Sequence, residues 1–215
     1  KPAEDTSLSA LALAKLIVAV GFPSGSVAIV TGRGGEAGAA LVDHPGVDKI
    51  SFTGSTRVGR EIGAKCGAAM KKHALELGGK SAAIVMDDAD IDAAVAGLAG
   101  ASFGNAGQIC VASARILAHA SVYELLVERL AAAAAARQAG GNFDEGATVG
   151  PIVNAAQHER IGALVEDARA RGAAVSGTAM IERDGYFVQP VVVSDLASDA
   201  RMAHEETFGP AVVVE

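Results

Sequence analysis

Cys110 is the residue whose type and surroundings most clearly allow covalent chemistry. It follows a glycine-containing turn, Phe103-Gly104-Asn105-Ala106-Gly107, and the residues after it are small. These surroundings leave room for an electrophile, and a thiol activated by a base, a positive group or oriented dipoles is a strong nucleophile. Taken alone, a cysteine is more often a small buried hydrophobe. Cys66 lies inside a predicted helix and is interpreted as structural.

Glu76 is a candidate general base within Leu75-Glu76-Leu77-Gly78-Gly79-Lys80-Ser81. The flanking leucines would partly desolvate the carboxylate and strengthen it as a base near neutral pH. The two glycines would let a cofactor or substrate approach the backbone. On composition alone, a glutamate at the end of a strand pointing into water explains the segment equally well.

Two further turns could bind an anion. Residues 32–38 contain four glycines between a predicted strand and a predicted helix, and they only approximate a dinucleotide fingerprint. Thr53-Gly54-Ser55 places a hydroxyl and bare amides at the start of another helix, where the dipole favours an anion. The alternatives are a turn without a ligand and an ordinary N-cap serine. Neither turn decides between them.

Alternating helices and strands must position these residues. Hydrophobic periodicity and stop signals predict helices over residues 6–20, 36–44, 56–69, 90–103, 122–137 and 154–171, with strands over 26–30, 49–52, 82–86, 114–118, near 175, 191–193 and 212–214. This order predicts an α/β fold built from βαβ units on a parallel sheet. Lys1 and Glu215 both fall where a domain should continue, so an internal piece of a longer protein is expected.

Composition excludes several classes of partner. The 215 residues are half hydrophobic and one fifth charged, and the net charge of −7 argues against nucleic-acid binding. No apolar run reaches the length of a membrane span. Two cysteines cannot form a disulfide framework, which favours a reducing cytoplasm. The five histidines show no metal-ligand spacing, and Asp87–Asp92 lacks the glycine and glutamate of a calcium loop, so no metal is expected.

Five sequence blocks resemble the aldehyde dehydrogenase superfamily, and the resemblance runs from Lys1 to Glu215. In the family's order the blocks are Lys1-Pro-Ala-Glu4, Phe52-Thr-Gly-Ser55, Leu75-Glu-Leu-Gly-Gly-Lys80, Asn105-Ala-Gly-Gln-Ile-Cys110 and Glu205-Glu-Thr-Phe-Gly-Pro210. One such block could arise by chance, but five in order are highly specific.

The resemblance implies oxidation of an aldehyde to a carboxylic acid. Cys110 would attack the carbonyl to give a thiohemiacetal, which becomes a thioester after hydride transfer. Glu76 would activate the water that hydrolyses the thioester. The backbone N–H of Cys110 would help to hold the oxyanion, and Ile109 and Val111 beside the thiol favour an uncharged aldehyde.

The resemblance also implies a set of cofactor contacts. Lys1 and Glu4 would face the adenosine ribose, and Gly34 and Gly38 would lie on the adenine side. Ser55 would contact the pyrophosphate. Glu206 would bind the nicotinamide ribose, Phe208 would pack near the nicotinamide ring, and Leu77 would also contact the cofactor. A carboxylate accepts from two ribose hydroxyls and repels a 2′-phosphate. Glu4 therefore favours NAD, with NADP possible.

We expect residues 1–73 to be the remainder of a Rossmann-like dinucleotide-binding domain and residues 74–215 most of a catalytic domain. The parent protein is expected to form a homo-oligomer. One alternative is a CoA-acylating enzyme, although such relatives commonly lack the glutamate found at Glu76. Another is a catalytically incompetent fragment that retains only the fold, because the family's side-chain oxyanion donor would lie upstream of Lys1.

Overall fold

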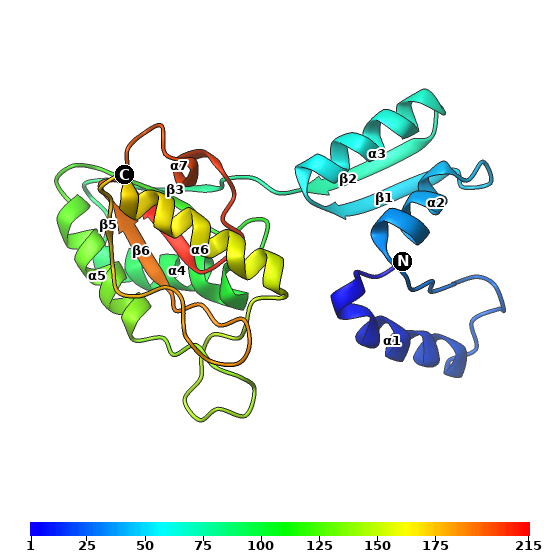
Figure 1. Cartoon of the computed structure of the whole chain (residues 1–215), viewed down its shortest axis with the longest axis horizontal. Helices are drawn as coiled ribbons and strands as arrows, with labels where there is room; N and C mark the ends of the chain where they lie inside the picture. Colours follow the sequence, from blue (N-terminus) through cyan, green and yellow to red (C-terminus); the bar gives the residue numbers. More distant parts are fainter. The chain divides into compact units, whose positions relative to one another are not determined.

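The computed structural model describes all 215 residues, which divide into two compact units, Lys1–Leu77 and Gly78–Glu215. Figure 1 labels the elements of both units. The division lies four residues beyond the expected boundary at 73/74. The reason is the strand β2 (Lys72–Leu77), which pairs in parallel along its whole length with β1 (Lys49–Gly54) and so remains with the first unit.

The first unit combines three helices with this two-stranded sheet. After one 3₁₀ turn, its elements in chain order are α1 (Ser7–Ala19), a π-helical segment (Gly34–Gly38) that continues into α2 (Ala39–Asp43), β1, α3 (Thr56–Ala68) and β2. Its small core joins Val42, Ile62 and the fully buried Cys66, with Ile50 and Leu75 packed against them. The structural interpretation of Cys66 is confirmed.

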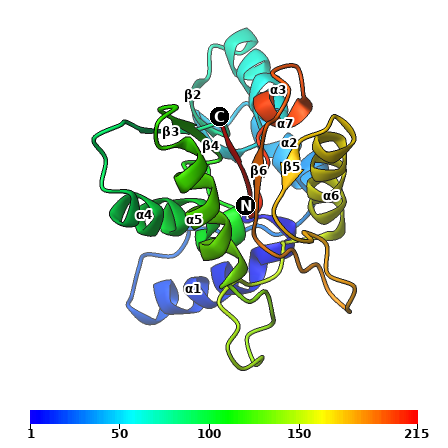
Figure 2. The same ribbon diagram turned by 90° about the vertical axis from the view of Figure 1, so that its left-hand side faces the viewer.

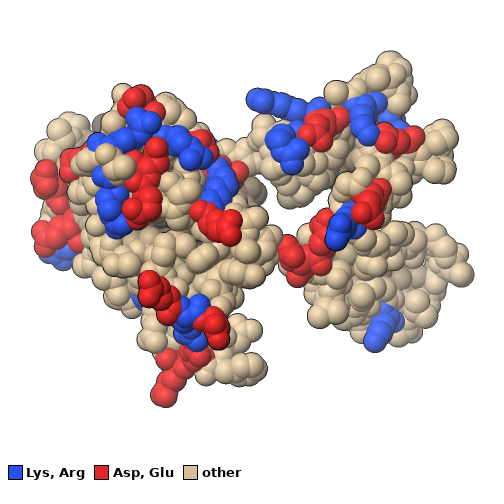
Figure 3. Space-filling model, viewed as in Figure 1, with Lys and Arg blue, Asp and Glu red and all other residues tan.

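The predicted helix near residues 6–20 is confirmed as α1, but none of its residues is buried. Leu8 and Val18, for example, are 82% and 77% exposed. Its surface is almost uncharged in Figure 3. The predicted strand at 26–30 is wrong: this segment forms no strand, and Val27 and Val30 are each about half exposed. An apolar run becomes a strand only when a neighbouring strand pairs with its backbone, and none does here.

The second unit has a five-stranded sheet in the order β3-β4-β7-β6-β5. Its elements in chain order are β3 (Ala82–Val85), α4 (Ile91–Phe103), a 3₁₀ turn (Gly104–Gly107), β4 (Arg115–Ala118), α5 (Tyr123–Ala135), α6 (Ala155–Ala170), β5 (Ala174–Val175), β6 (Val191–Ser194), α7 (Arg201–His204) and β7 (Ala211–Val214). The pairs from β3 to β6 are parallel as predicted, whereas the edge strand β5 is antiparallel to β6.

Helices cover both faces of this sheet, as Figure 2 shows. Val191 and Val193 of β6 face the cluster that includes α6 and α7, while Val192 faces the cluster with α4 and α5. Successive side chains of a strand point to opposite faces. Because both faces are buried, the central strands must be continuously apolar, which is why β6 and β7 consist almost entirely of valine.

Helix starts follow the capping residues of the sequence. Ser55, Asp90 and Asn154 each precede a helix, and their side chains accept hydrogen bonds from the amides of Val58, Ala93 and Gln157. Asp90 therefore serves as a helix cap, as expected for the acidic run at 87–92. No helix in the structure combines the length and apolar character needed to cross a lipid bilayer.

The core of the second unit can be tested with two adjacent leucines of α5. Leu126 is fully buried, whereas Leu125 is 43% exposed. We expect Leu126→Ala to lower the free energy of unfolding by about 2–5 kcal/mol, because it removes buried methyl groups and leaves a cavity. Leu125→Ala should change it by less than about 1 kcal/mol. Urea unfolding followed by circular dichroism measures both, and equal losses would contradict this packing.

Candidate active site

The thiol of Cys110 is exposed at the end of a strained turn. The chain leaves α4 and takes three successive residues into the left-handed region, Asn105 (φ 50°), Ala106 (φ 55°) and Gly107 (φ 68°). Non-glycine residues adopt this region at a cost of about 1–3 kcal/mol each and keep it only when the surroundings hold them. The backbone N–H of Cys110 donates to no acceptor of the protein, so it is available to an incoming oxyanion.

Side-chain hydrogen bonds hold this turn in place. Asn105 donates to the Gln108 carbonyl at 3.1 Å, and Gln108 donates back to the Asn105 carbonyl at 3.3 Å. The Gln108 side chain also accepts from the Val153 amide at 2.9 Å and donates to the Pro151 carbonyl at 3.4 Å. The cysteine turn is thus tied to the segment that leads into α6.

Gly107 brings this turn against a second loop, residues 205–210. A Cβ atom at Gly107 would overlap the carbonyl of Gly209, and one at Gly209 would overlap the Ile161 side chain of α6. The missing side chain at Gly107 thus allows the two backbones to approach, and the missing side chain at Gly209 allows the second loop to pack on α6. The turn that leads to Cys110 and the loop that carries Glu206 and Phe208 are therefore in direct contact at Gly107.

Glu206 and Phe208 occupy distinctive positions in that loop. The Glu206 carboxylate lies over the backbone of Gly78, where a Cβ would overlap it. Phe208 has a left-handed backbone, with φ 49°. Among the residues expected to bind cofactor or react, the second unit thus brings Cys110, Glu206 and Phe208 onto two adjoining loops.

The first unit brings four other candidates together. Lys1 donates to the Gly32 carbonyl at 2.9 Å, and its Nζ lies 3.6 Å from the Glu4 carboxylate. Glu4 accepts from the Gly34 amide at 2.5 Å. This backbone hydrogen bond is the main reason that the pKa of Glu4 lies below its usual value. A Cβ at Gly38 would lie 3.7 Å from the Lys1 side chain, so all four surround one glycine-rich turn.

Ser55, Leu77 and Glu76 lie at the carboxyl ends of β1 and β2. Ser55 follows β1 and caps α3, and Leu77 packs tightly on Gly59 of that helix. Glu76 pairs in register with Thr53. The carboxyl ends of parallel strands are where ligands bind in open α/β sheets.

The expected desolvation of Glu76 by its leucine neighbours is wrong. Glu76 is exposed, whereas Leu75 and Leu77 are partly buried. Strand alternation places the carboxylate on the face opposite both leucines. The structure agrees instead with the alternative that the sequence left open, a glutamate near the end of a strand that points into water.

Lys80 is a polar residue of this region that the sequence analysis did not single out. Its Nζ donates to the hydroxyl of the fully buried Thr207 at 3.2 Å. Burial lowers the pKa of Lys80 to about 8, and Arg115 and Arg160 act in the same direction, while Glu215 and Glu206 oppose the shift. No group of three His, Cys, Asp or Glu side chains in the structure is arranged to hold a metal ion.

The contact between the two loops can be tested by adding one methyl group. Gly107→Ala should lower the free energy of unfolding by about 1–3 kcal/mol, because the new Cβ meets the Gly209 carbonyl and the backbone is left-handed. Gly100→Ala is the matched control, since nothing lies within 4 Å of its Cβ position in α4. That change should stabilise the protein by up to about 1 kcal/mol. Urea unfolding measures the free energy of unfolding of both variants. A Gly107→Ala variant as stable as the wild type would contradict the contact between the two loops.

Lys80 should give stability a pH dependence of known sign. Its pKa falls on folding from 10.5 to about 8, so the unfolded state binds more protons between those values. Stability rises with pH wherever the unfolded state binds more protons. The stability of the wild type relative to Lys80→Met should therefore rise between pH 8 and pH 10.5. Urea unfolding at several pH values measures the difference, and a constant difference would contradict the shift.

Comparison with known proteins identifies the family. The model of the aldehyde dehydrogenase family matches residues 1–215. A mitochondrial aldehyde dehydrogenase of Leishmania tarentolae is 44% identical over 216 residues, which are 100% of this chain and 43% of that protein. The NADP(+) succinate-semialdehyde dehydrogenase of Escherichia coli (strain K12) is 42% identical over 211 residues, covering 98% of this chain and 44% of that enzyme.

Solved structures agree with the sequence comparison. The NAD+ complex of the Bacillus cereus aldehyde dehydrogenase superimposes with a TM-score of 0.96 at 40% identity, covering 100% of this chain and 44% of that one. The chain thus spans less than half the length of the relatives it matches. The predicted α/β fold is confirmed, and the chain belongs to the aldehyde dehydrogenase family.

Proposed function

We propose that the protein oxidises an aldehyde to the carboxylic acid with NAD(P)+, using Cys110 as the nucleophile and Glu76 as the general base. The observation that carries the proposal is the exposed Cys110 thiol on a turn packed against the loop of Glu206 and Phe208. Family membership supplies the reaction class, and the named relatives act on aldehydes.

The residues of the first unit fit the adenosine end of a dinucleotide. The side chain of Glu4 is 49% exposed. The hydrogen bond from the Gly34 amide stabilises the carboxylate and so lowers the pKa of Glu4. An ionised carboxylate accepts hydrogen bonds from two ribose hydroxyls and repels a 2′-phosphate. We therefore propose NAD as the preferred cofactor, with NADP as the second possibility. The related Bacillus cereus structure contains NAD+, and the Escherichia coli relative is named for NADP(+).

Lys1, Gly34, Gly38, Ser55 and Leu77 complete the proposed set on this side. The two glycines present no side chain, so a flat ring can approach the backbone. Ser55 supplies a hydroxyl at the start of α3, where the dipole and unpaired amides favour a phosphate. In the second unit, Glu206 is proposed to hold the nicotinamide ribose and Phe208 to pack near the ring.

Cys110 is proposed to perform the first covalent step. Its thiolate adds to the carbonyl carbon, forms a C–S bond and moves the carbonyl electron pair onto oxygen. The unpaired N–H of Cys110 is available to hold that oxyanion. The bound nicotinamide ring supplies the acceptor for the hydride that leaves the same carbon. The carbonyl then re-forms, and Cys110 carries the acyl group as a thioester.

Glu76 is proposed to complete the reaction. Its carboxylate takes a proton from water, whose oxygen attacks the thioester carbonyl. The C–S bond breaks, Cys110 recovers its thiolate and the acid is released. The exposure of Glu76 favours this role, because water reaches the carboxylate freely. A CoA-acylating reaction would not need this carboxylate.

The surroundings of the thiol favour an uncharged aldehyde. Val111, next to Cys110, is 73% exposed, and Ile109 on the other side is partly buried. Neither residue offers a charge to bind a carboxylate on the substrate. Both cysteines are free, and the thiol of Cys110 is exposed, which fits the proposed cytoplasmic location. Homo-oligomeric assembly remains part of the proposal.

Reduction of NAD+ in the full-length protein tests these roles. We expect turnover with a neutral aldehyde, less with a carboxylate-bearing aldehyde, and at least a thousandfold loss in Cys110→Ala because no thiohemiacetal forms. Glu76→Gln should keep a stoichiometric burst of NADH and lose steady turnover. Cys66→Ala and Glu61→Gln are the matched controls, and both should retain activity.

The outcomes separate the alternatives. Full steady turnover in Glu76→Gln with added CoA, and not without it, would favour the acylating reaction. Activity that survives in Cys110→Ala would overturn the proposed mechanism. No NADH from any aldehyde would favour a protein that keeps only the fold.

A further inference from the structure

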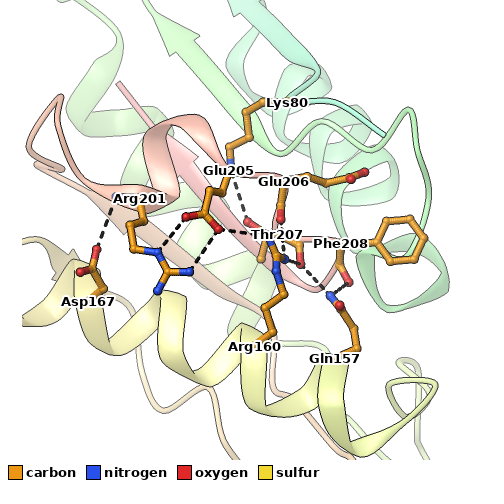
Figure 4. Close-up of polar contacts among 9 residues, drawn as sticks. All are labelled: Lys80, Gln157, Arg160, Asp167, Arg201, Glu205, Glu206, Thr207 and Phe208. Atoms are coloured by element: carbon orange, nitrogen blue, oxygen red, sulfur yellow. Dashed lines mark hydrogen bonds and ion pairs between the residues drawn. The ribbon is translucent and has the colours of Figure 1, made fainter. Parts of the chain in front are cut away.

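Two side chains of α6 hold the backbone of the loop that carries Glu206. Arg160 donates to the Glu206 carbonyl at 2.6 Å and to the Thr207 carbonyl at 3.3 Å. Gln157 donates to the Thr207 carbonyl at 2.9 Å and to the Phe208 carbonyl at 3.0 Å. Figure 4 shows both side chains reaching the loop from the helix. Three successive carbonyls are thus turned toward α6.

Lys80 holds the same loop through a different group. Its Nζ donates at 3.2 Å to the hydroxyl of Thr207, whose side chain is fully buried. Lys80 follows the Gly78–Gly79 pair in the chain, and Gly78 is the residue over which the Glu206 carboxylate lies. The loop is therefore held by α6 through its backbone and by Lys80 through Thr207.

The two adjacent glutamates of the loop differ in their partners. Glu205 accepts from Arg201 at 2.8 and 3.1 Å and from Arg160 at 3.3 Å. The carboxylate of Glu206 accepts no hydrogen bond from the protein, and in Figure 4 the contact of Glu206 with Arg160 is through its backbone carbonyl. The Phe208 ring points to the same side as the Glu206 carboxylate in that view. Glu205 is used to hold the loop, which leaves Glu206 free for a ligand.

We propose that Arg160, Gln157 and Lys80 hold residues 206–208 in place and thereby position Glu206 and Phe208 for the dinucleotide. We call these three the loop clamp. They act through the loop as positioning residues, so the inference rests on the proposed function for the identity of the ligand. The left-handed Phe208 supports it, because such a backbone persists only where surrounding contacts hold it.

Other contacts hold the cysteine turn next to the same loop. Gln108 binds the backbone of Pro151 and Val153, just before α6, and Gly107 packs on Gly209. The segment just before α6 therefore supports the turn of Cys110, and α6 itself supports the loop of Glu206. Removing a clamp contact should release the loop while the cysteine turn keeps its own anchors.

The first test is amide hydrogen exchange of residues 205–209 in the full-length protein without cofactor. We expect Arg160→Met and Gln157→Glu to exchange at least tenfold faster there, since each removes donors to the loop carbonyls. Gln157→Glu is nearly isosteric, so folding is preserved while the donor becomes an acceptor. Arg169→Met is the matched control, because Arg169 lies on the same helix but binds Glu166 and the Gly177 carbonyl.

The second test is NAD+ affinity by calorimetry, with the split between KM and kcat. We expect the two clamp variants and Lys80→Met to weaken NAD+ binding about tenfold and to raise KM for NAD+ more than they lower kcat. Arg160→Lys should recover only part of the affinity, because an ammonium cannot span two carbonyls and a carboxylate as a guanidinium does.

The outcomes distinguish this inference from the proposed function. If the wild type binds NAD+ but the clamp variants behave like Arg169→Met, the clamp is wrong and the function stands. Faster exchange of the loop with unchanged NAD+ affinity would also overturn the clamp, because the loop would then be held without positioning the ligand. If the wild type binds no dinucleotide, both the proposed function and the loop clamp's role in cofactor binding are wrong.

Discussion

The contact between Gly107 and Gly209 is the constraint on which the candidate site depends. It joins two loops about one hundred residues apart in the chain. A side chain at Gly107 would separate them, and a side chain at Gly209 would push the second loop away from Ile161 of α6. Three residues span at most roughly 11 Å. Cys110 is therefore confined near the contact on one side, and Phe208, one residue before Gly209, is confined on the other. The thiol and the loop are held together by backbone packing rather than by a bond between their functional groups.

The sheet makes this contact possible. Gly209 and Pro210 lead directly into β7, which lies at the centre of the sheet with both faces covered. The cysteine turn begins where α4 ends, and α4 packs on one face of that sheet through Phe103. Helix α6 packs on the other face and contacts Gly209 through Ile161. Both loops thus start from rigid elements, which is the arrangement that holds a reactive group with precision.

Most elements could be predicted because their signals are local. Capping residues mark the starts of α3, α4 and α6, and the apolar runs of β6 and β7 reflect burial on both faces. Strand formation, in contrast, depends on a partner elsewhere. The apolar segment 26–30 has none, whereas β2, which begins with Lys72 and His73, is a strand because β1 pairs with it. The single turn of α7 is too short to carry a helical period.

At Cys110 and Glu76 the residue type suggests chemistry, so the sequence alone could propose both as candidates. The candidate site was not predictable where backbone atoms are the partners. Gln157 and Arg160 lie three residues apart, which places them on one side of α6. Every residue has a backbone carbonyl, so the sequence cannot show which distant carbonyls these side chains contact. The different environments of Glu205 and Glu206 were hidden for the same reason, because two identical adjacent residues differ only in what surrounds them.

The chemistry of the two cations that flank the loop explains their different placement. Arg160 holds carbonyls and a carboxylate together, which requires a planar group with several donors. At Lys80, burial outweighs the attraction of Glu215 and Glu206 and lowers the pKa to about 8. An ammonium ion can lose its proton there, whereas a guanidinium cannot. The protonation of the Lys80 side chain that contacts Thr207 therefore changes near pH 8.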